Sequence, residues 1–312
     1  MSTVLVTGGA GFIGSHLVER LLEEGHAVRV LDDLSSGRRA NVPAGVELFE
    51  GCITDAALVR RAAAGADRAV HLAAQVSVPQ SVEEPERSYA VNVTGTLNLL
   101  EAARAEGMRA VVFAASSAAY GDHESLPLGE DLVPRPLSPY ASGKVAGEHL
   151  MRVWSECYGL HTTSLRFFNV FGPRQVDDSP YTGVIAIFAR ALLDGRQPTL
   201  FGDGGQTRDF TFVANVVDGI LLALRAEHAP GQVLNLGAGD RVSLLELHAA
   251  MARALGMPAE PSFGPPRAGD VRHSQADPAL VREVLGWGAG VPWEVGLEKT
   301  LDWYRADSSN DR

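Results

Sequence analysis

Residues 4–14 are VLVTGGAGFIG. Three apolar residues that favour a strand run into a turn with glycines at positions 8, 11 and 14, and the helical pattern Gly14–Glu24 follows. Such a strand–turn–helix unit brings backbone N–H groups close to a diphosphate at the positive end of the helix. Because the Gly-x-x-Gly-x-x-Gly spacing has this context on both sides, it predicts a dinucleotide-binding site.

The pattern of short apolar strands and amphipathic helices continues outward from this unit through the first half of the chain. Strands are predicted at Val4–Val6, Val28–Leu31, Val46–Phe49, Ala69–Leu72, Ala110–Ala114 and Thr163–Phe167, with helices at Glu86–Glu106 and Tyr140–Tyr158. This alternation predicts an α/β fold, a Rossmann-type doubly wound parallel sheet. Functional residues are then expected directly after the strands.

The pattern loosens after about Gly172, where prolines punctuate shorter elements. We therefore expect a dinucleotide-binding domain over residues 1–172 and a smaller C-terminal substrate-binding lobe formed mainly by 173–312. Parts of 205–240 are expected to rejoin the first domain, because Asp209–Leu224 alternates and then becomes helical.

The bulk composition restricts the class of partner. A net charge of −11 argues against nucleic acid, since phosphate repulsion is not offset. Two cysteines are too few for a disulfide framework or a structural zinc site, so no metal site is expected. There is no signal-like start and no apolar run of ~20 residues that could span a bilayer. These features predict a cytoplasmic protein without a membrane partner.

An acidic residue ends the second predicted strand. Asp32 lies about twenty residues beyond the glycine turn, where a carboxylate accepts hydrogen bonds from the adenosine ribose. It would repel a 2′-phosphate, so the sequence favours NAD over NADP.

A tyrosine and a lysine stand at i and i+4 of a predicted helix. Tyr140 and Lys144 therefore share a face, and Lys144 is one of only two lysines in the chain. A neighbouring cation stabilises a phenolate, which lets Tyr140 accept a proton near neutral pH. Ser116 and Ser117 directly follow the strand Ala110–Ala115. Either hydroxyl could bond the reacting oxygen, although Ser117 by itself is more typical of a turn.

Several motifs together carry a family resemblance. They are Gly8–Gly14, Asp32, His71-Leu-Ala-Ala, Asn92-Val-Thr-Gly-Thr, Ser116–Gly121, Tyr140 with Lys144, Arg166-Phe-Phe-Asn169 and Gly205-Gln-Thr-Arg-Asp-Phe210. The chain resembles the extended short-chain dehydrogenases over nearly its whole length, and within them the UDP-glucose and UDP-N-acetylglucosamine 4-epimerases.

The resemblance implies a role for individual residues. Tyr140 is then the base, Lys144 its electrostatic partner, and Ser116, four residues before Tyr120, the hydrogen-bonding hydroxyl. The residues implied on the NAD side are Gly8, Gly11, Phe12, Ile13, Gly14, Asp32, Ile53, Asn92, Tyr140 and Lys144. Those implied on the UDP-sugar side are Ser116, Asn169, Phe201, Arg208, Arg267, Asp270 and Ser274.

Two positions depart from related sequences. Cys52 stands where relatives carry an aspartate that accepts from the adenine amine, which affects the expected affinity for the cofactor. Ser117 and Ala118 stand where related dehydratases carry Asp-Glu, so elimination lacks its proton donor. The resemblance therefore favours epimerisation at C4 of a UDP-hexose through a transient 4-keto sugar.

Rival activities remain open at this point. UDP-glucuronate 4-epimerisation or net reduction of a 4-keto sugar uses the same scaffold, and a noncatalytic NAD-binding regulator needs only the glycine loop. Ser274 is the sixth residue counted from Gly269, where enzymes confined to plain hexoses carry tyrosine. The smaller serine predicts that N-acetylated hexoses are also accepted. The family's paired helices, here Glu86–Glu106 and Tyr140–Tyr158, predict a homodimer.

Overall fold

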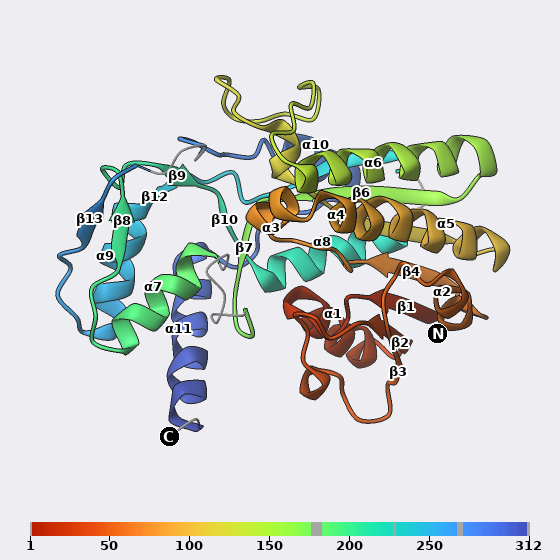
Figure 1. Cartoon of the computed structure of the whole chain (residues 1–312), viewed down its shortest axis with the longest axis horizontal. Coiled ribbons are helices and arrows are strands. Elements are labelled where there is room, and N and C mark those ends of the chain that lie inside the picture. The colour runs from red at the N-terminus through yellow and green to blue at the C-terminus, as the bar shows by residue number, and fades with distance from the viewer. Residues whose placement is uncertain (1, 176–182, 227–228, 267–270, 311–312) are drawn as a thin grey trace.

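The computed structural model of the chain describes residues 2–175, 183–226, 229–266 and 271–310. A seven-stranded sheet forms its centre (Figure 1). Its strands are β1 (Thr3–Thr7), β2 (Ala27–Asp32), β3 (Glu47–Glu50), β4 (Arg68–His71), β5 (Ala110–Ser116), β6 (His161–Phe167) and β11 (Gln232–Leu236). They lie in the order β11-β6-β5-β4-β1-β2-β3, and every neighbouring pair is parallel.

The sheet is doubly wound, as predicted. The chain moves from β1 outward through β2 to β3, and then crosses to the other side of β1 to place β4. This reversal between β1 and β4 is the topological switch point, where a crevice opens beyond the carboxyl ends of the strands. β11, which the strand pattern of the first half did not include, extends the sheet beside β6.

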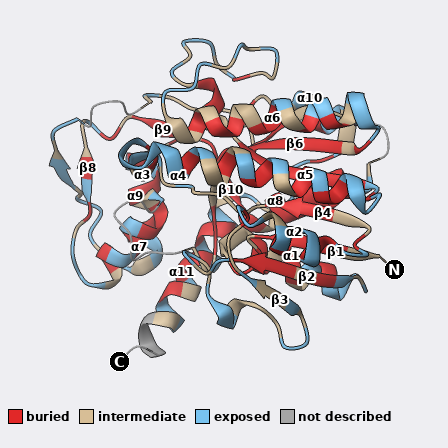
Figure 2. Ribbon diagram, turned by 45° about the vertical axis from the view of Figure 1, so that its right-hand side comes forward, coloured by how far each residue is buried: buried red, intermediate tan, exposed pale blue. Residues whose placement is uncertain are grey.

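Helices cover both faces of the sheet, because its strands are apolar on both sides (Figure 2). Along β1, Val4 and Val6 face one core, and Leu5 faces the other. The first core is covered by α1 (Phe12–Glu23), α8 (Val213–Arg225) and α10 (Ala279–Leu285). The second is covered by α2 (Ala56–Ala63), α5 (Gly95–Ala105) and α6 (Pro139–Tyr158).

Irregular helical segments link β4 to α5. They are α3 (Val78–Glu83), α4 (Pro85–Tyr89) and one turn of π-helix at Ala90–Thr94. The continuous helix predicted over Glu86–Glu106 is therefore interrupted near its start. Short 3₁₀ turns occur at Arg39–Asn41 and Ser117–Tyr120.

A smaller lobe packs around a third core. Its elements are β7 (Asn169–Phe171), α7 (Val184–Leu193), β8 (Thr199–Phe201), β9 (Thr207–Arg208), β10 (Phe210–Phe212), β12 (Val242–Ser243), α9 (Leu244–Leu255), β13 (Ser262–Gly264) and α11 (Trp293–Asn310). The strands form three two-stranded sheets, β10 with β7, β12 with β9 and β13 with β8, and Thr207 of β9 also forms an isolated bridge with His273. None of the helices in the described ranges combines the length and apolar character needed to cross a bilayer.

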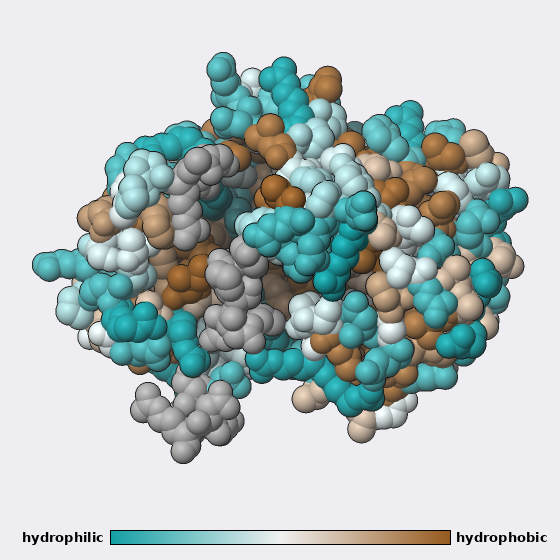
Figure 3. Space-filling model, in the orientation of Figure 1, coloured by the Kyte–Doolittle hydropathy of each residue, from teal (hydrophilic) through white to brown (hydrophobic). Residues whose placement is uncertain are grey.

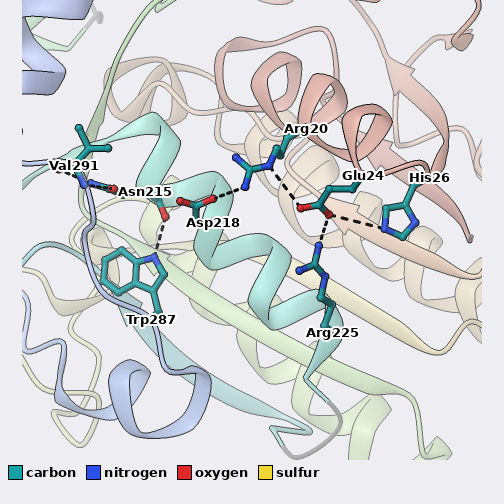
Figure 4. A network of polar contacts seen from close by, with 8 residues as sticks. All are labelled: Arg20, Glu24, His26, Asn215, Asp218, Arg225, Trp287 and Val291. Carbon is teal, nitrogen blue, oxygen red and sulfur yellow. Dashed lines mark hydrogen bonds and ion pairs between the residues drawn. The ribbon is translucent and has the colours of Figure 1, made fainter.

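Polar contacts attach α8 to the elements around it (Figure 4). Arg20 of α1 forms an ion pair with Asp218 at 3.5 Å, and Arg225 pairs with Glu24. The Asn215 backbone carbonyl accepts a hydrogen bond from the Trp287 indole at 2.9 Å. The Asn215 side-chain amide donates to the Val291 carbonyl and accepts from the Val291 N–H. The two ion pairs join α8 to the N-terminal unit, and the contacts of Asn215 join it to the segment that follows α10.

Candidate active site

A cavity of about 810 Å³ lies at the carboxyl edge of the sheet. The end of nearly every strand on both sides of the switch point contributes to its wall. Of the predicted residues, Gly8, Gly11, Phe12, Ile13, Gly14, Asp32, Ile53, Ser116, Tyr140 and Lys144 line it. The glycine turn and the tyrosine–lysine pair, 126 or more positions apart in sequence, therefore face the same space.

The glycine turn is shaped for close approach. Gly8 has φ +74°, and a Cβ placed on Gly14 would lie 2.1 Å from the Gly8 carbonyl oxygen, so a side chain at position 14 would break the turn. Gly11 caps α1 without a side-chain hydrogen bond, and the first turn of α1 holds no acidic residue. The positive end of α1 therefore faces the cavity without a carboxylate beside it, which fits the diphosphate of a dinucleotide.

Asp32 lies at the end of β2, on the wall of the cavity. Its carboxylate accepts from the backbone N–H groups of Ala10 and Leu34, both at 2.9 Å. Burial raises the pKa of Asp32, while these two hydrogen bonds lower it. The contacts hold the glycine turn and the loop after β2 together around one acceptor, which retains lone pairs for a ribose.

Asn92 does not line the cavity but holds part of its wall. Its side chain lies in the π-helical turn and forms two hydrogen bonds with the backbone of Gln75, at 3.0 and 3.1 Å. Gln75 belongs to the loop after β4 and lines the cavity. The structure therefore places Asn92 behind the cavity wall, and its role on the cofactor side stays a prediction.

His71 connects the same turn to the glycine loop. Its Nε2 lies 3.0 Å from the Thr96 hydroxyl, which donates to the Asn92 carbonyl at 2.7 Å, so Nε2 carries the proton. Its Nδ1 accepts from the Thr7 hydroxyl at 2.8 Å. Burial, and then the charge of Lys144, lower the pKa of His71 to about 3. A neutral imidazole thus joins β1, β4 and the π-helical turn.

The predicted catalytic residues Ser116, Tyr140 and Lys144 all line the cavity. Ser116 ends β5, and its oxygen accepts from the Ala118 N–H at 3.2 Å, which leaves its hydroxyl proton for another acceptor. Ser138 caps α6 by accepting from the Ala141 N–H, and Pro139 occupies the first turn. This cap begins the helix directly before Tyr140.

Lys144 is buried beneath Tyr140. Its ammonium donates to the Ala114 carbonyl at 2.7 Å and lies 5.9 Å from the centre of the Tyr140 ring. Burial lowers the pKa of Lys144 to about 7, although the Glu148 carboxylate raises it. Burial raises the pKa of Tyr140, and a hydrogen bond with the Ser116 side chain lowers it. Proton transfer at this centre therefore depends on the charges placed around it.

The predicted sugar-side residues are more scattered. Phe201 lines a second cavity of about 490 Å³, in the smaller lobe, with Asp203 and Arg272. Arg208 lies on β9 and donates to the Thr207 carbonyl at 2.9 Å. Ser274 lies beside β9, where its N–H donates to the same carbonyl at 3.1 Å.

Three more predicted residues complete the set. Asn169 begins β7 and donates its N–H to the Asp209 carbonyl at 3.0 Å. Arg267 and Asp270 lie outside the described residues.

Several residues of the site were not predicted. The loop 33–38 follows β2 and Gln75 follows β4, and both line the cavity. Their position after strands of a parallel sheet is the signal that could have identified them. Cys52, one of the two positions that depart from the pattern expected from the resemblance, also lines the cavity. A buried pair, Glu148 with Arg166, borders the site without lining it.

The doubly wound sheet and its cavity define a Rossmann-type dinucleotide-binding protein with a serine, a tyrosine and a lysine at its centre. The model of the NAD dependent epimerase/dehydratase family matches residues 4–237. The chain belongs to this family and is an enzyme of the epimerase/dehydratase type.

Three proteins are similar to this chain over nearly its full length. It is 46% identical to a UDP-glucose 4-epimerase of Mycolicibacterium smegmatis, over 97% of this chain and 99% of the relative. A crystal structure of the Thermotoga maritima UDP-glucose 4-epimerase with UDP-glucose superposes with a TM-score of 0.94, at 38% identity, over 98% and 99% of the two chains. The UDP-N-acetylglucosamine 4-epimerase of Methanobrevibacter ruminantium, in complex with UDP-N-acetylmuramic acid, has the same TM-score and coverage at 34% identity.

Proposed function

We propose that the chain catalyses NAD-dependent 4-epimerisation of UDP-hexoses, interconverting UDP-glucose and UDP-galactose. The observation that carries the proposal is the single cavity that joins the glycine turn to Ser116, Tyr140 and Lys144. The similarity to UDP-glucose 4-epimerases over almost the full length of both chains supports the choice of reaction.

Each residue of the cavity has its own role in the proposed reaction. Tyr140 takes the proton of the sugar C4 hydroxyl, and the Lys144 ammonium beneath it stabilises the phenolate. Ser116 donates to the reacting oxygen. When bound, NAD would supply reversible hydride transfer at C4, and the 4-keto sugar would have to turn over in the cavity between the two transfers for the opposite face to receive the hydride. Tyr140 returns its proton to the C4 oxygen, and because the hydride is both removed and given back, no net oxidation occurs.

The positions beside Ser116 favour epimerisation over elimination. Ser117 and Ala118 form the turn after β5, and neither carries an acid. Loss of a 6-hydroxyl needs a proton donor near the leaving oxygen, which this turn does not supply.

We also propose that N-acetylated hexoses are substrates. Ser274 lies beside β9, which carries Arg208, the residue expected at the diphosphate. A serine there leaves the volume of an aromatic ring for a C2 substituent. The similarity to a UDP-N-acetylglucosamine 4-epimerase agrees with this.

A set of assays with different sugar nucleotides separates the main alternatives. The purified protein is mixed with UDP-galactose without added NAD, and UDP-glucose is measured, with Tyr140→Phe as the control variant. Conversion by the wild type alone is the expected result. Conversion of UDP-glucuronate but not UDP-galactose would instead support the uronate epimerase. Turnover that consumes one NADH for each 4-keto sugar would support a reductase. NAD binding with no turnover of any of these sugars would refute the proposed substrate class.

We propose that the protein is a homodimer and that it is cytoplasmic. Cys52 and Cys157 are both free thiols, which suits a reducing compartment. Exposed apolar side chains on α4, α5 and α6 supply a surface for a second copy.

A further inference from the structure

A buried acid lies one helical turn beyond Lys144. Helix α6 places Tyr140, Lys144 and Glu148 four residues apart, so the three side chains share one face. Glu148 receives two hydrogen bonds from Arg166 of β6, Nε to Oε1 and Nη2 to Oε2, both at 2.8 Å. Only 4% of the Arg166 side chain and 5% of the Glu148 side chain are exposed. This is a buried bidentate pair next to the catalytic face.

Arg166 extends the contact to the other side of the site. Its guanidinium lies 4.5 Å from the centre of the Tyr120 ring, and Tyr120 ends the turn that Ser116 begins. The Tyr120 hydroxyl donates to Asn235 of β11 at 2.6 Å, and the Asn235 amide donates to the Leu128 carbonyl at 2.8 Å. The pair therefore connects α6, which carries the base and the lysine, to the turn after β5, which carries Ser116.

The charges around Lys144 come from several elements. Glu148 on α6 favours its ammonium form, and the Arg166 guanidinium on β6 balances Glu148. His71 on β4 is neutral, and the Tyr120 phenol stays protonated because burial raises its pKa to about 12. Arg87 on α4 lines the same cavity and is partly exposed.

We propose that Glu148 and Arg166 are positioning residues for Tyr140, Lys144 and Ser116, and that their opposite charges balance the field in which Lys144 holds its proton. The inference rests on the proposed function, because it assumes that Lys144 supports Tyr140 as the base. Loss of one member alone leaves a buried, uncompensated charge beside the site. Glu148→Gln leaves excess positive charge, and Arg166→Met leaves excess negative charge.

The composition of the chain makes the test direct. It has two lysines, Lys144 and Lys299. In a Lys299→Arg background, NMR of ¹³Cε-labelled lysine reports on Lys144 alone, and its titration needs no turnover. The pKa of Lys144, about 7 in the parent protein, should fall in Glu148→Gln and rise in Arg166→Met. Removal of one nearby buried charge from a partly polar interior should shift the pKa of Lys144 by about half a unit or more. Shifts in the same direction, or no shift in either variant, would overturn the charge role.

Two further variants keep the proposal testable if a single charge loss prevents folding. The double variant Glu148→Gln/Arg166→Met removes both charges. The pKa of its Lys144 should lie between those of the two single variants or, if these do not fold, within about half a unit of the parent value.

Glu148→Asp keeps the charge but shortens the side chain, so the bidentate contact is lost. It should lower kcat at least about tenfold, with KM and bound NAD changed little, if positioning matters. Parental kcat in Glu148→Asp, or a large shift in the double variant, would refute the assignment. Absence of epimerase activity in the parent would overturn the proposed function, whereas the lysine titration would still decide the charge balance.

Discussion

Tyr140 carries the proton transfer in the proposed reaction, and its ring is positioned by the start of α6 and by Lys144 beneath it. Tyr140→Phe should remove the base while leaving the fold and the bound NAD in place. Turnover should fall by roughly 10²–10⁴, the usual scale of general acid–base catalysis. Steady-state kinetics with measurement of NAD per protein checks this. A variant with activity within a few-fold of the wild type would refute the role of Tyr140.

Ser274 is the residue that we expect to set the range of sugars. Ser274→Tyr adds a ring where a C2 N-acetyl group would have to pass, so it should abolish UDP-N-acetylglucosamine epimerisation and spare UDP-glucose. Comparing kcat/KM for both substrates in both proteins measures the selectivity. Equal loss of the two activities, or no N-acetyl activity in the wild type, would contradict the assignment.

His71 should make the folded state sensitive to acid. Its pKa is about 3 in the folded protein and near ~6.5 when unfolded, so between these values only the unfolded chain binds the proton. Stability is therefore lost as the pH falls below ~6.5. Relative to His71→Asn, the wild type should lose about 2 kcal/mol of unfolding free energy between pH 7.5 and 5.0.

Urea unfolding at both pH values measures this difference. His149→Asn is the control, since His149 is exposed on α6, and it should show no such change. If the difference in unfolding free energy between the wild type and His71→Asn is the same at pH 5.0 as at pH 7.5, the prediction is wrong.

At the scale of elements, α6 depends on a close approach to β5. A Cβ at Gly147 would lie 2.5 Å from Cζ of Phe113, whose ring lies 4.9 Å from the Lys144 ammonium. Helix propensity alone favours alanine by about 1 kcal/mol, but overpacking costs about 1–3 kcal/mol. Gly147→Ala should therefore lower the melting temperature and reduce turnover, because α6 and Phe113 must move apart.

A second glycine provides the matched control for this substitution. Gly288 has no neighbouring atom within 4 Å of a Cβ and no positive φ, so Gly288→Ala should leave both quantities nearly unchanged. Thermal unfolding of the two variants tests the difference. A stabilised Gly147→Ala protein would show that packing does not limit this helix.

At the scale of the whole molecule, we expect two copies to pair through α4, α5 and α6. Tyr89, Leu97, Val153 and Tyr158 are exposed on these helices, and hydrophobic surface lies over α5 and α6 in Figure 3. Light scattering at micromolar concentration should give twice the chain mass. Leu97→Glu should dissociate the pair, because it buries a charge at the contact.

Leu22 on α1 is the control position, since its side chain is exposed to the same extent, 37%, as that of Leu97. Leu22→Glu should leave the mass unchanged. A monomeric wild type would rule out the homodimer.

Local sequence was sufficient to predict the doubly wound sheet, the glycine turn and the tyrosine–lysine pair that line its cavity. The glycine turn, the apolar strands and the i, i+4 spacing of Tyr140 and Lys144 depend on backbone periodicity over a few residues, which a sequence states directly. The sequence predicts that parts of 205–240 rejoin the first domain, but not the pairing of β11 with β6 or the π-helical turn around Asn92, because both depend on packing between distant segments.

Only the tertiary structure decided how the site is held together. Glu148 and Arg166 are 18 residues apart, and Tyr120 and Asn235 are 115 apart, yet they form one buried array beside Lys144. Glutamate, arginine and asparagine are also common on exposed surfaces, so the residue types alone do not show that these side chains are buried together. Burial gives them their effect, because a charge removed from water acts strongly on its neighbours, and burial is a property of the folded chain.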